Sequence, residues 1–154
     1  HIETIVQVPG MKESERDRFL TRFSEDNHGT LVGFAVMGGI FGEGIDLAGE
    51  RLCGAVIVGV GLPAFTPERE LIRQYHTENQ QPGYEFAYVY PGLNRVLQAA
   101  GRVVRSENDR GVILLIDQRY SYRHYASLLP KEWRPIRVRD TAQTNAALAA
   151  FWTS

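Results

Sequence analysis

The sequence predicts one α/β domain in three layers, with a mainly parallel β-sheet flanked by helices. Three short apolar runs, at 31–37, 55–60 and 112–116, have the length and continuous apolarity of strands buried on both faces. Segments with helical spacing of apolar residues lie between them, and strands that alternate with helices are typical of a parallel sheet. A chain of 154 residues, 44% of them hydrophobic, is long enough for one core and too short for two comfortable domains.

The first elements are a strand and a helix. β-Branched residues alternate along 2–8, and Pro9-Gly10 ends this run. Apolar residues then recur at helical spacing within 12–23, and turn-forming residues at 26–29 lead into the strand at 31–37. We therefore expect the order strand, helix, strand in the first quarter of the chain.

A glycine-studded connection joins the strands at 31–37 and 55–60. Its core, residues 38–46, is too rich in glycine for regular structure and is flanked by two predicted core strands. We expect a loop there, at one edge of the sheet.

The second half contains helices around one more strand. Pro63 and Pro67 open a polar helical stretch that runs to about Gln80. A further helix is expected over 84–105 with a break at Pro91-Gly92. The strand at 112–116 ends in Asp117, which we interpret as a cap of the following turn. Closing helices are expected over 122–129 and 141–152.

The overall charge does not identify a partner, because 17 basic and 18 acidic residues give a formal net charge of −1. The local distribution is more informative, since Arg102, Arg105 and Arg110 crowd one segment. A second basic cluster at 131–139 is expected to be a solvated face.

Several classes of protein are disfavoured. The single cysteine, Cys53, excludes an internal disulfide and a cysteine-based zinc or iron–sulfur site built within this chain. No apolar run approaches the roughly 20 residues of a membrane-spanning helix, and the N-terminus lacks the pattern of a signal peptide. We expect a soluble intracellular protein, cytoplasmic or nucleoid-associated, with no membrane partner.

The sharpest chemical pattern lies just before the strand at 112–116. Arg102 and Arg105 are three residues apart, so on a helix both guanidinium groups emerge from one face, with Gln98 one turn earlier. Two planar, permanently charged groups can clamp phosphate oxygens, and Gly101 allows close approach of another backbone. The alternative is structural: the arginines pair with Glu43, Asp46 or Glu107 and only pin the helix.

Two motifs resemble those of superfamily 2 DNA helicases of the DinG/XPD-like family. Residues 98–105 match the pattern QxxGRxxR of motif VI, and residues 39–46, which end in Phe-Gly-Glu-Gly-Ile-Asp, resemble motif V of that branch. Both occur in the family's order and at its usual separation. The resemblance covers nearly the whole chain and implies a RecA-like second motor domain, the C-terminal one of two.

The resemblance also implies roles for individual residues. Arg102 and Arg105 would act as arginine fingers toward ATP held between two motor domains. The remaining nucleotide-facing positions would be Gln98, Gly101, Glu43, Gly44 and Asp46. Gly39 and Phe41, at the start of the motif V loop, would lie near single-stranded DNA.

The sequence lacks three features of complete helicases of this family. The chain has no GxxxxGK(S/T) phosphate loop, no acidic box for magnesium and no set of four cysteines for an iron–sulfur cluster. We therefore expect residues 1–154 to be a fragment of a larger protein that binds ATP and Mg²⁺ with its first motor domain. The isolated chain is expected to bind no cofactor or metal and to hydrolyse no ATP.

A second hypothesis is a catalytically silent RecA-like module that docks protein or nucleic acid. The intact arginine pair argues against it, since a silent module needs neither. The alternating aromatic residues Tyr84, Phe86, Tyr88 and Tyr90 raise a related question, because they either stack bases or pack the start of a helix on the core. We favour packing. Polarity of translocation and the choice between DNA and RNA are not encoded in these patterns.

Overall fold

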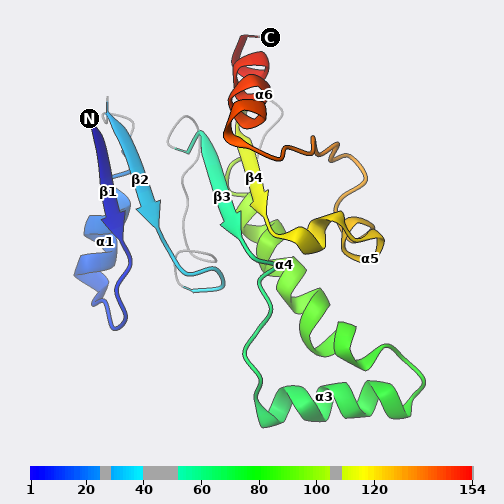
Figure 1. Cartoon of the computed structure of the whole chain (residues 1–154). Helices are drawn as coiled ribbons and strands as arrows, with labels where there is room; N and C mark the ends of the chain where they lie inside the picture. Colours follow the sequence, from blue (N-terminus) through cyan, green and yellow to red (C-terminus); the bar gives the residue numbers. More distant parts are fainter. Residues whose placement is uncertain (25–28, 40–51, 105–108, 154) are drawn as a thin grey trace.

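The computed structural model describes residues 1–24, 29–39, 52–104 and 109–153 (Figure 1). Its strands are β1 (Ile2–Val6), β2 (Thr30–Phe34), β3 (Gly54–Val58) and β4 (Val112–Ile116). β1 pairs in parallel with β2, and β3 pairs in parallel with β4. The predicted α/β class, with parallel strands flanked by helices, is confirmed.

The first strand pair is covered by helix α1 (Glu13–Thr21). The backbone N–H of Lys12 donates to the Glu15 carboxylate at 2.7 Å, which satisfies one of the amides that a helix start leaves unpaired. Phe19 is buried, and partly buried apolar side chains that include Ile5 and Phe23 pack against it. This small cluster attaches α1 to one face of the β1–β2 pair.

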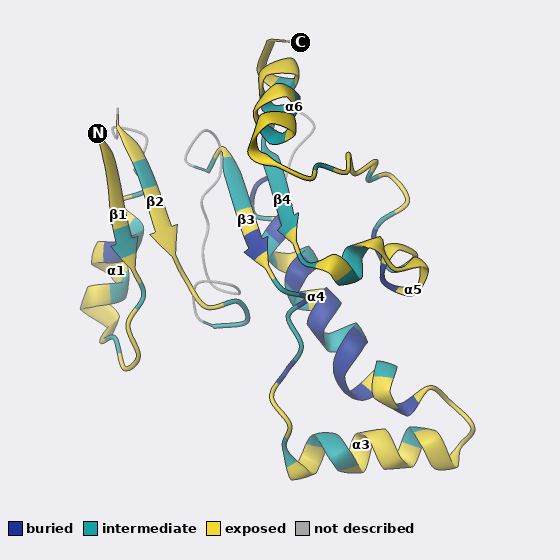
Figure 2. Cartoon of the chain, viewed as in Figure 1, coloured by how far each residue is buried: buried dark blue, intermediate teal, exposed yellow. Residues whose placement is uncertain are grey.

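The expectation that the strands at 31–37 and 55–60 are buried on both faces is wrong for the described residues. In β2, Phe34 is 56% exposed, and in β3, Val56 and Val58 are 64% and 71% exposed. Figure 2 shows these strands largely in the colours of exposed and intermediate residues. Neighbouring side chains of a strand point to opposite faces, and Gly33 faces Phe19 and Phe23, so Phe34 points to the opposite face of the β1–β2 pair.

Helices lie on both faces of the second strand pair. On one face, Ile57 of β3 packs with Val96 and Ala100 of helix α4 (Tyr90–Ala100). On the other face, a shallow hollow is lined by residues of β3, by Leu114 of β4 and by Leu148 of helix α6 (Thr141–Thr153). The three layers of the predicted architecture are therefore α4, the strands and α6.

The expected break at Pro91-Gly92 is replaced by a wider helical turn. A π-helix, η2 (Glu85–Val89), leads directly into α4, with Pro91 in the first turn of α4. Proline has no N–H to donate to the carbonyl four residues earlier, that of Ala87. The Arg69 guanidinium donates to this carbonyl at 3.0 Å instead, which compensates for the missing backbone bond. The helical path therefore continues through the proline.

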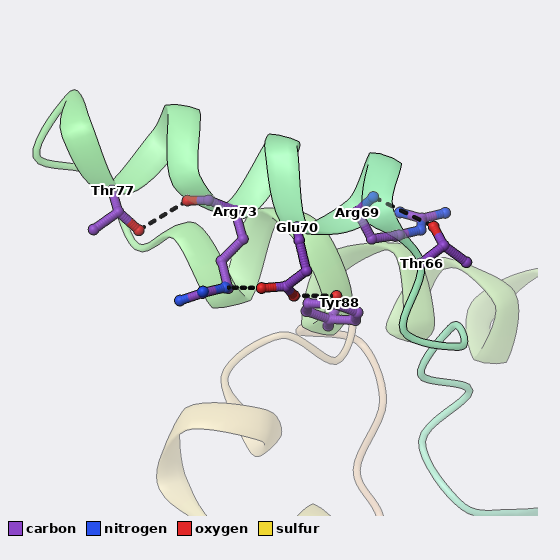
Figure 3. Close-up of polar contacts among 6 residues, drawn as sticks. All are labelled: Thr66, Arg69, Glu70, Arg73, Thr77 and Tyr88. Atoms are coloured by element: carbon purple, nitrogen blue, oxygen red, sulfur yellow. Dashed lines mark hydrogen bonds and ion pairs between the residues drawn. The ribbon is translucent and has the colours of Figure 1, made fainter.

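Helix α3 (Pro67–Glu78) is joined to η2 by the bond between Tyr88 and Glu70, which Figure 3 shows among the polar contacts of α3. The Tyr88 hydroxyl donates to Glu70 at 2.5 Å, and Arg73 donates to the same carboxylate at 2.8 Å. Burial raises the pKa of Tyr88 to about 12, while the bond from Tyr88 is the main reason that the pKa of Glu70 is lowered. The Thr66 hydroxyl caps the start of α3.

The chain after β4 is held by an ion pair that also caps a turn. Asp117 precedes the short 3-10 helix η3 (Gln118–Ser121) and accepts the backbone N–H of Arg119 at 2.8 Å, so its predicted capping role is confirmed. The Arg119 guanidinium donates to both oxygens of this carboxylate, at 2.9 and 2.7 Å. These side-chain bonds lower the pKa of Asp117 and raise that of Arg119.

The closing helices differ in length from the prediction. The helix expected over 122–129 is only α5 (Arg123–Ala126), whereas α6 agrees closely with the expected 141–152. The N–H of Leu129 bonds to the carbonyl of Ala126, three residues back, as in the tight turns that close helices. Among the described residues, no helix has both the length and the apolarity needed to cross a membrane.

Candidate functional site

The C-terminal end of α4 carries three of the predicted site residues. The helix ends at Ala100. The next turn is of the 3-10 type: the Arg102 N–H donates to the carbonyl of Ala99 at 3.2 Å, and the Val103 N–H donates to the carbonyl of Ala100 at 3.0 Å. Gln98 is exposed and Arg102 is half-buried. The side chains of Gln98 and Arg102 therefore reach the surface at one end of the helix.

The helix expected to continue to residue 105 therefore ends earlier. Gly101 is the C-cap, and Val103 beyond it is 3% exposed, so the tightened turn places an apolar side chain in the core. Glycine and β-branched valine are also poor helix formers. Arg102 lies in this turn rather than on a regular helical face. Arg105 lies outside the described residues, so its position relative to Arg102 stays a prediction.

The end of β2 is a tight turn at the start of motif V. The N–H of Gly39 bonds to the carbonyl of Val36 at 3.1 Å, and Gly38 adopts a φ of +78° at the third position of the turn. A positive φ there is the mark of a type II turn and favours glycine. The Gln7 side chain accepts the N–H of Val36 at 2.8 Å and so holds the turn from the β1 side.

This turn shortens the strand expected over 31–37 and positions Gly39, the first residue predicted to lie near DNA. The other motif V positions lie outside the described residues: Phe41, Glu43, Gly44 and Asp46.

Helix α4 lies in direct backbone contact with the segment that follows β3. A Cβ added to Gly92 would lie 2.7 Å from the carbonyl oxygen of Val60 and 3.0 Å from the nitrogen of Leu62. Reciprocally, a Cβ on Gly61 would lie 2.5 Å from the carbonyl oxygen of Gly92. Only glycine permits such an approach, which fixes the position of α4 relative to the segment that follows β3.

One residue of this region was not predicted from the sequence. Arg95 projects from α4 to the turn at the end of β2, where a Cβ on Gly38 would lie 2.8 Å from its Nε. It also reaches the carbonyl of Gly61 at 3.5 Å, the outer limit of a hydrogen bond. Its spacing of three residues before Gln98, on the same helical side, was the available signal.

The alternating aromatic residues divide between core and surface. Tyr88 is 1% exposed, in agreement with the expectation that this segment packs on the core. Tyr84 and Phe86 are 42% and 36% exposed, and the Phe86 ring stacks on His76 with centroids 4.1 Å apart. The Phe86 ring thus packs against another side chain of the protein. The second basic cluster is solvated as expected, because Lys131, Arg134, Arg137 and Arg139 are exposed.

The chemistry available at the end of α4 is donation to oxyanions. Gln98 offers a neutral amide, and Arg102 a permanently charged guanidinium, on adjacent turns. Within the described ranges, no group of three or more His, Cys, Asp or Glu side chains is arranged to hold a metal ion. The described part of the site thus presents donors without a carboxylate cluster.

The sequence profile of the family described as Helicase C-terminal domain matches residues 1–136. The chain belongs to this family. This match and the relatives described below place the chain in the DinG/XPD-like branch of superfamily 2 helicases, as the sequence predicted. Helix α6 lies beyond the matched residues.

Curated relatives of this helicase C-terminal domain carry helicase names. It is 28% identical over 125 residues to "Probable ATP-dependent helicase MJ0942" of Methanocaldococcus jannaschii, which covers 75% of this chain and 18% of that protein. It is 25% identical over 132 residues to "ATP-dependent DNA helicase YoaA" of Haemophilus influenzae, which covers 83% of this chain and 20% of that protein. The chain thus spans about a fifth of the length of these two relatives.

A solved structure described as "XPD_Helicase" resembles the fold. The TM-score is 0.59 at 22% sequence identity, and the match covers 80% of this chain and 22% of that one. This likeness supports the RecA-like α/β architecture of the domain.

Proposed function

We propose that this domain is the second motor domain of an ATP-dependent DNA helicase. Arg102 and Arg105 would contact the phosphates of ATP bound by a first motor domain of the same polypeptide. The turn at Gly39, together with Phe41, would form part of the track for single-stranded DNA. The family match and the names of the relatives support a helicase. The residue roles rest on the two motifs and on the geometry of α4.

The observation that carries the proposal is the surface position of Gln98 and Arg102 at the end of a firmly seated helix. α4 contacts the end of β3 backbone to backbone at Gly92, so its C-terminal end is preorganised. Donors that are fixed before the reaction stabilise developing charge more effectively than mobile ones. Arg102 is half-buried, which further limits its freedom.

The chain's own residues fit half of an ATP site. Gln98 and Arg102 would orient phosphate oxygens, and Glu43, Gly44, Asp46 and Gly101 would contribute the other contacts on this side of the cleft. ATP supplies the phosphoryl group to be transferred, with Mg²⁺ as its counterion. Because the sequence has no phosphate loop or acidic box, we expect the isolated domain to hydrolyse no ATP.

The test is DNA-stimulated ATP hydrolysis by the parent protein. Arg105→Ala and Arg102→Ala are compared with Arg137→Ala, which removes an exposed arginine outside the site. Loss of an arginine finger should lower kcat by about 10³-fold or more, while the Arg137 variant keeps the activity of the wild type.

The opposite result favours the other candidate function. If both site variants hydrolyse ATP at the rate of the wild type, motif VI serves as scaffolding, and the domain is a silent module for docking protein or nucleic acid. A parent protein with no ATPase activity in the presence of DNA would refute the motor assignment directly.

A further inference from the structure

Arg95 occupies the junction between the two predicted motifs. Its Cα belongs to α4, three residues before Gln98 and seven before Arg102. Arg102 lies in the turn that directly follows the end of α4, so the last turns of this helix connect the two arginines. The Arg95 guanidinium, however, lies against Gly38, at the entrance to motif V.

The position of α4 relative to β3 does not require Arg95. Backbone contact between Gly92 and the segment Val60–Leu62 already fixes that distance. The position of α4 relative to the end of β2 is different. The described strands of the two pairs share no ladder, and the turn at the end of β2 meets α4 through side chains, namely Arg95 on Gly38 and Met37 on the cluster around Val96.

We propose that Arg95 is a positioning residue that transmits the position of the Gly38–Gly39 turn to the motif VI end of α4. This inference rests on the proposed function. DNA that binds at Gly39 displaces or fixes the turn, and the turn is in contact with the Arg95 guanidinium. The guanidinium is planar and rigid, and its other side reaches the carbonyl of Gly61. A displacement of the turn would therefore move or reorient the Arg95 side chain, which belongs to α4.

Gly38 contributes to the same contact between the turn and Arg95. Its φ of +78° is needed for the turn, and a Cβ there would come within 2.9 Å of Cδ and 2.8 Å of Nε of Arg95. Gly38→Ala must therefore move the Arg95 side chain as well as strain the backbone. Gly10 provides a matched control, because it has a φ of +75° and nothing within 4 Å of an added Cβ. Gly10→Ala strains the backbone alone.

The experiment measures ATP hydrolysis by the parent protein with and without an oligo(dT) strand. Arg95→Ala should lower the DNA-stimulated kcat by about tenfold, within the range of about 5- to 150-fold that is typical of coupling between two sites. Its rate without DNA and its KM for ATP should stay within about twofold of the wild type, because Arg95 touches neither ligand. A residue with a purely structural role would lower both rates together.

Gly38→Ala should reproduce the loss of stimulation, and Gly10→Ala should not. The double variant Gly38→Ala/Arg95→Ala should be no worse than Arg95→Ala, because the added methyl then has no guanidinium to displace. If Arg95→Ala lowers the Tm, Arg95→Met keeps the aliphatic stem between Gly38 and Gly61 and removes the guanidinium. The same loss of stimulation is expected from it.

Full DNA stimulation in both Arg95→Ala and Arg95→Met overturns the inference, as does equal loss in Gly38→Ala and Gly10→Ala. Failure of the proposed function looks different. If the wild type shows no DNA-stimulated ATPase, or if Arg102→Ala and Arg105→Ala retain it in full, the motor assignment is refuted. The proposed role of Arg95 is then refuted as well. If those two variants lose activity while the Arg95 variants keep stimulation, only the inference falls.

Discussion

Replacing Gly92 with alanine tests how closely α4 approaches the end of β3. The added methyl would lie 2.7 Å from the carbonyl oxygen of Val60 and 3.0 Å from the nitrogen of Leu62, against about 3.5 Å for an ordinary contact. Both atoms belong to the backbone, so no side-chain rotation relieves the overlap. The helix must move, at a cost of about 3 kcal/mol, near the upper end of overpacking in cores.

An opposing effect has to be subtracted. Alanine is favoured over glycine in a helix by about 1 kcal/mol, which leaves a net destabilisation of about 2 kcal/mol. For a domain of this size, that difference lowers the Tm by about 4 to 8 °C. Urea unfolding of the chain, followed by far-UV circular dichroism, should show a lower midpoint with an unchanged m-value.

Gly101→Ala serves as the control. Gly101 has a φ of −65°, which alanine adopts freely, and the nearest atoms to its added Cβ are carbonyl oxygens of the preceding turn, at 3.2 and 3.7 Å. We expect a change of less than about 1 kcal/mol. If Gly92→Ala proves as stable as Gly101→Ala, the backbone contact that seats α4 is not required for the fold, and the argument for a preorganised motif VI fails.

Three further substitutions probe the chain around β4. Asp117→Asn keeps the cap but removes the carboxylate that pairs with Arg119, so it should cost about 1 kcal/mol at neutral pH. Because the Arg119 guanidinium lowers the pKa of Asp117, in urea titrations the difference from wild type should begin to shrink as the pH falls through about 4 and should vanish only below the lower folded-state pKa. An unchanged difference at pH 2 would refute this. Tyr120→Phe deletes a 2.8 Å bond to a backbone carbonyl and should cost about 1 kcal/mol. Because burial raises the Tyr120 pKa to about 12, wild-type stability should also fall between about pH 10 and 12, and a variant with the same alkaline slope would contradict this assignment. Arg110→Ala removes a 2.6 Å bond to the Phe151 carbonyl and a contact with its ring, so amide exchange in α6 should accelerate; exchange at the wild-type rate would show that α6 is held without it.

The sequence predicted the order of the elements well, because hydrophobic runs and turn residues act locally. The strand at 112–116 and the helix starting near Pro67 lie where they were predicted. The expected burial of that strand on both faces is wrong, since Ile116 is 47% exposed. The helix predicted over 84–105 differed from the structure in its expected break at Pro91-Gly92 and at its C-terminal end, in both cases for a tertiary reason. Arg69, far away in sequence, satisfies the carbonyl that Pro91 leaves open, and Val103 turns into the core. Neither contact is visible in a local window.

In the candidate site, too, residues with a local sequence pattern were predicted and a residue that depends on a tertiary contact was not. The motif residues Gln98 and Arg102 were identified from spacing alone, and the structure places both at the surface at one end of α4. Arg95 was missed because its partner is a glycine, which has no side chain to suggest a contact. Close approach to Gly38 depends on where β2 ends, and the predicted strand extended into the first two residues of that turn.

The division of the core into separate clusters predicts an uneven resistance to opening. Around the β1–β2 pair, Phe19 is the one buried residue of its cluster in the described part of the chain, whereas the clusters around α4 contain eight buried residues. Amides of β1 and β2 should therefore exchange with solvent through partial unfolding that leaves β3, β4 and α4 intact. The half that carries the turn at Gly39 then has the lower free energy of local unfolding, and the half that carries Arg102 has the higher one. Under the proposed function, the half that opens more easily would be the one that contacts DNA, and the more stable half would be the one that holds Arg102 toward ATP.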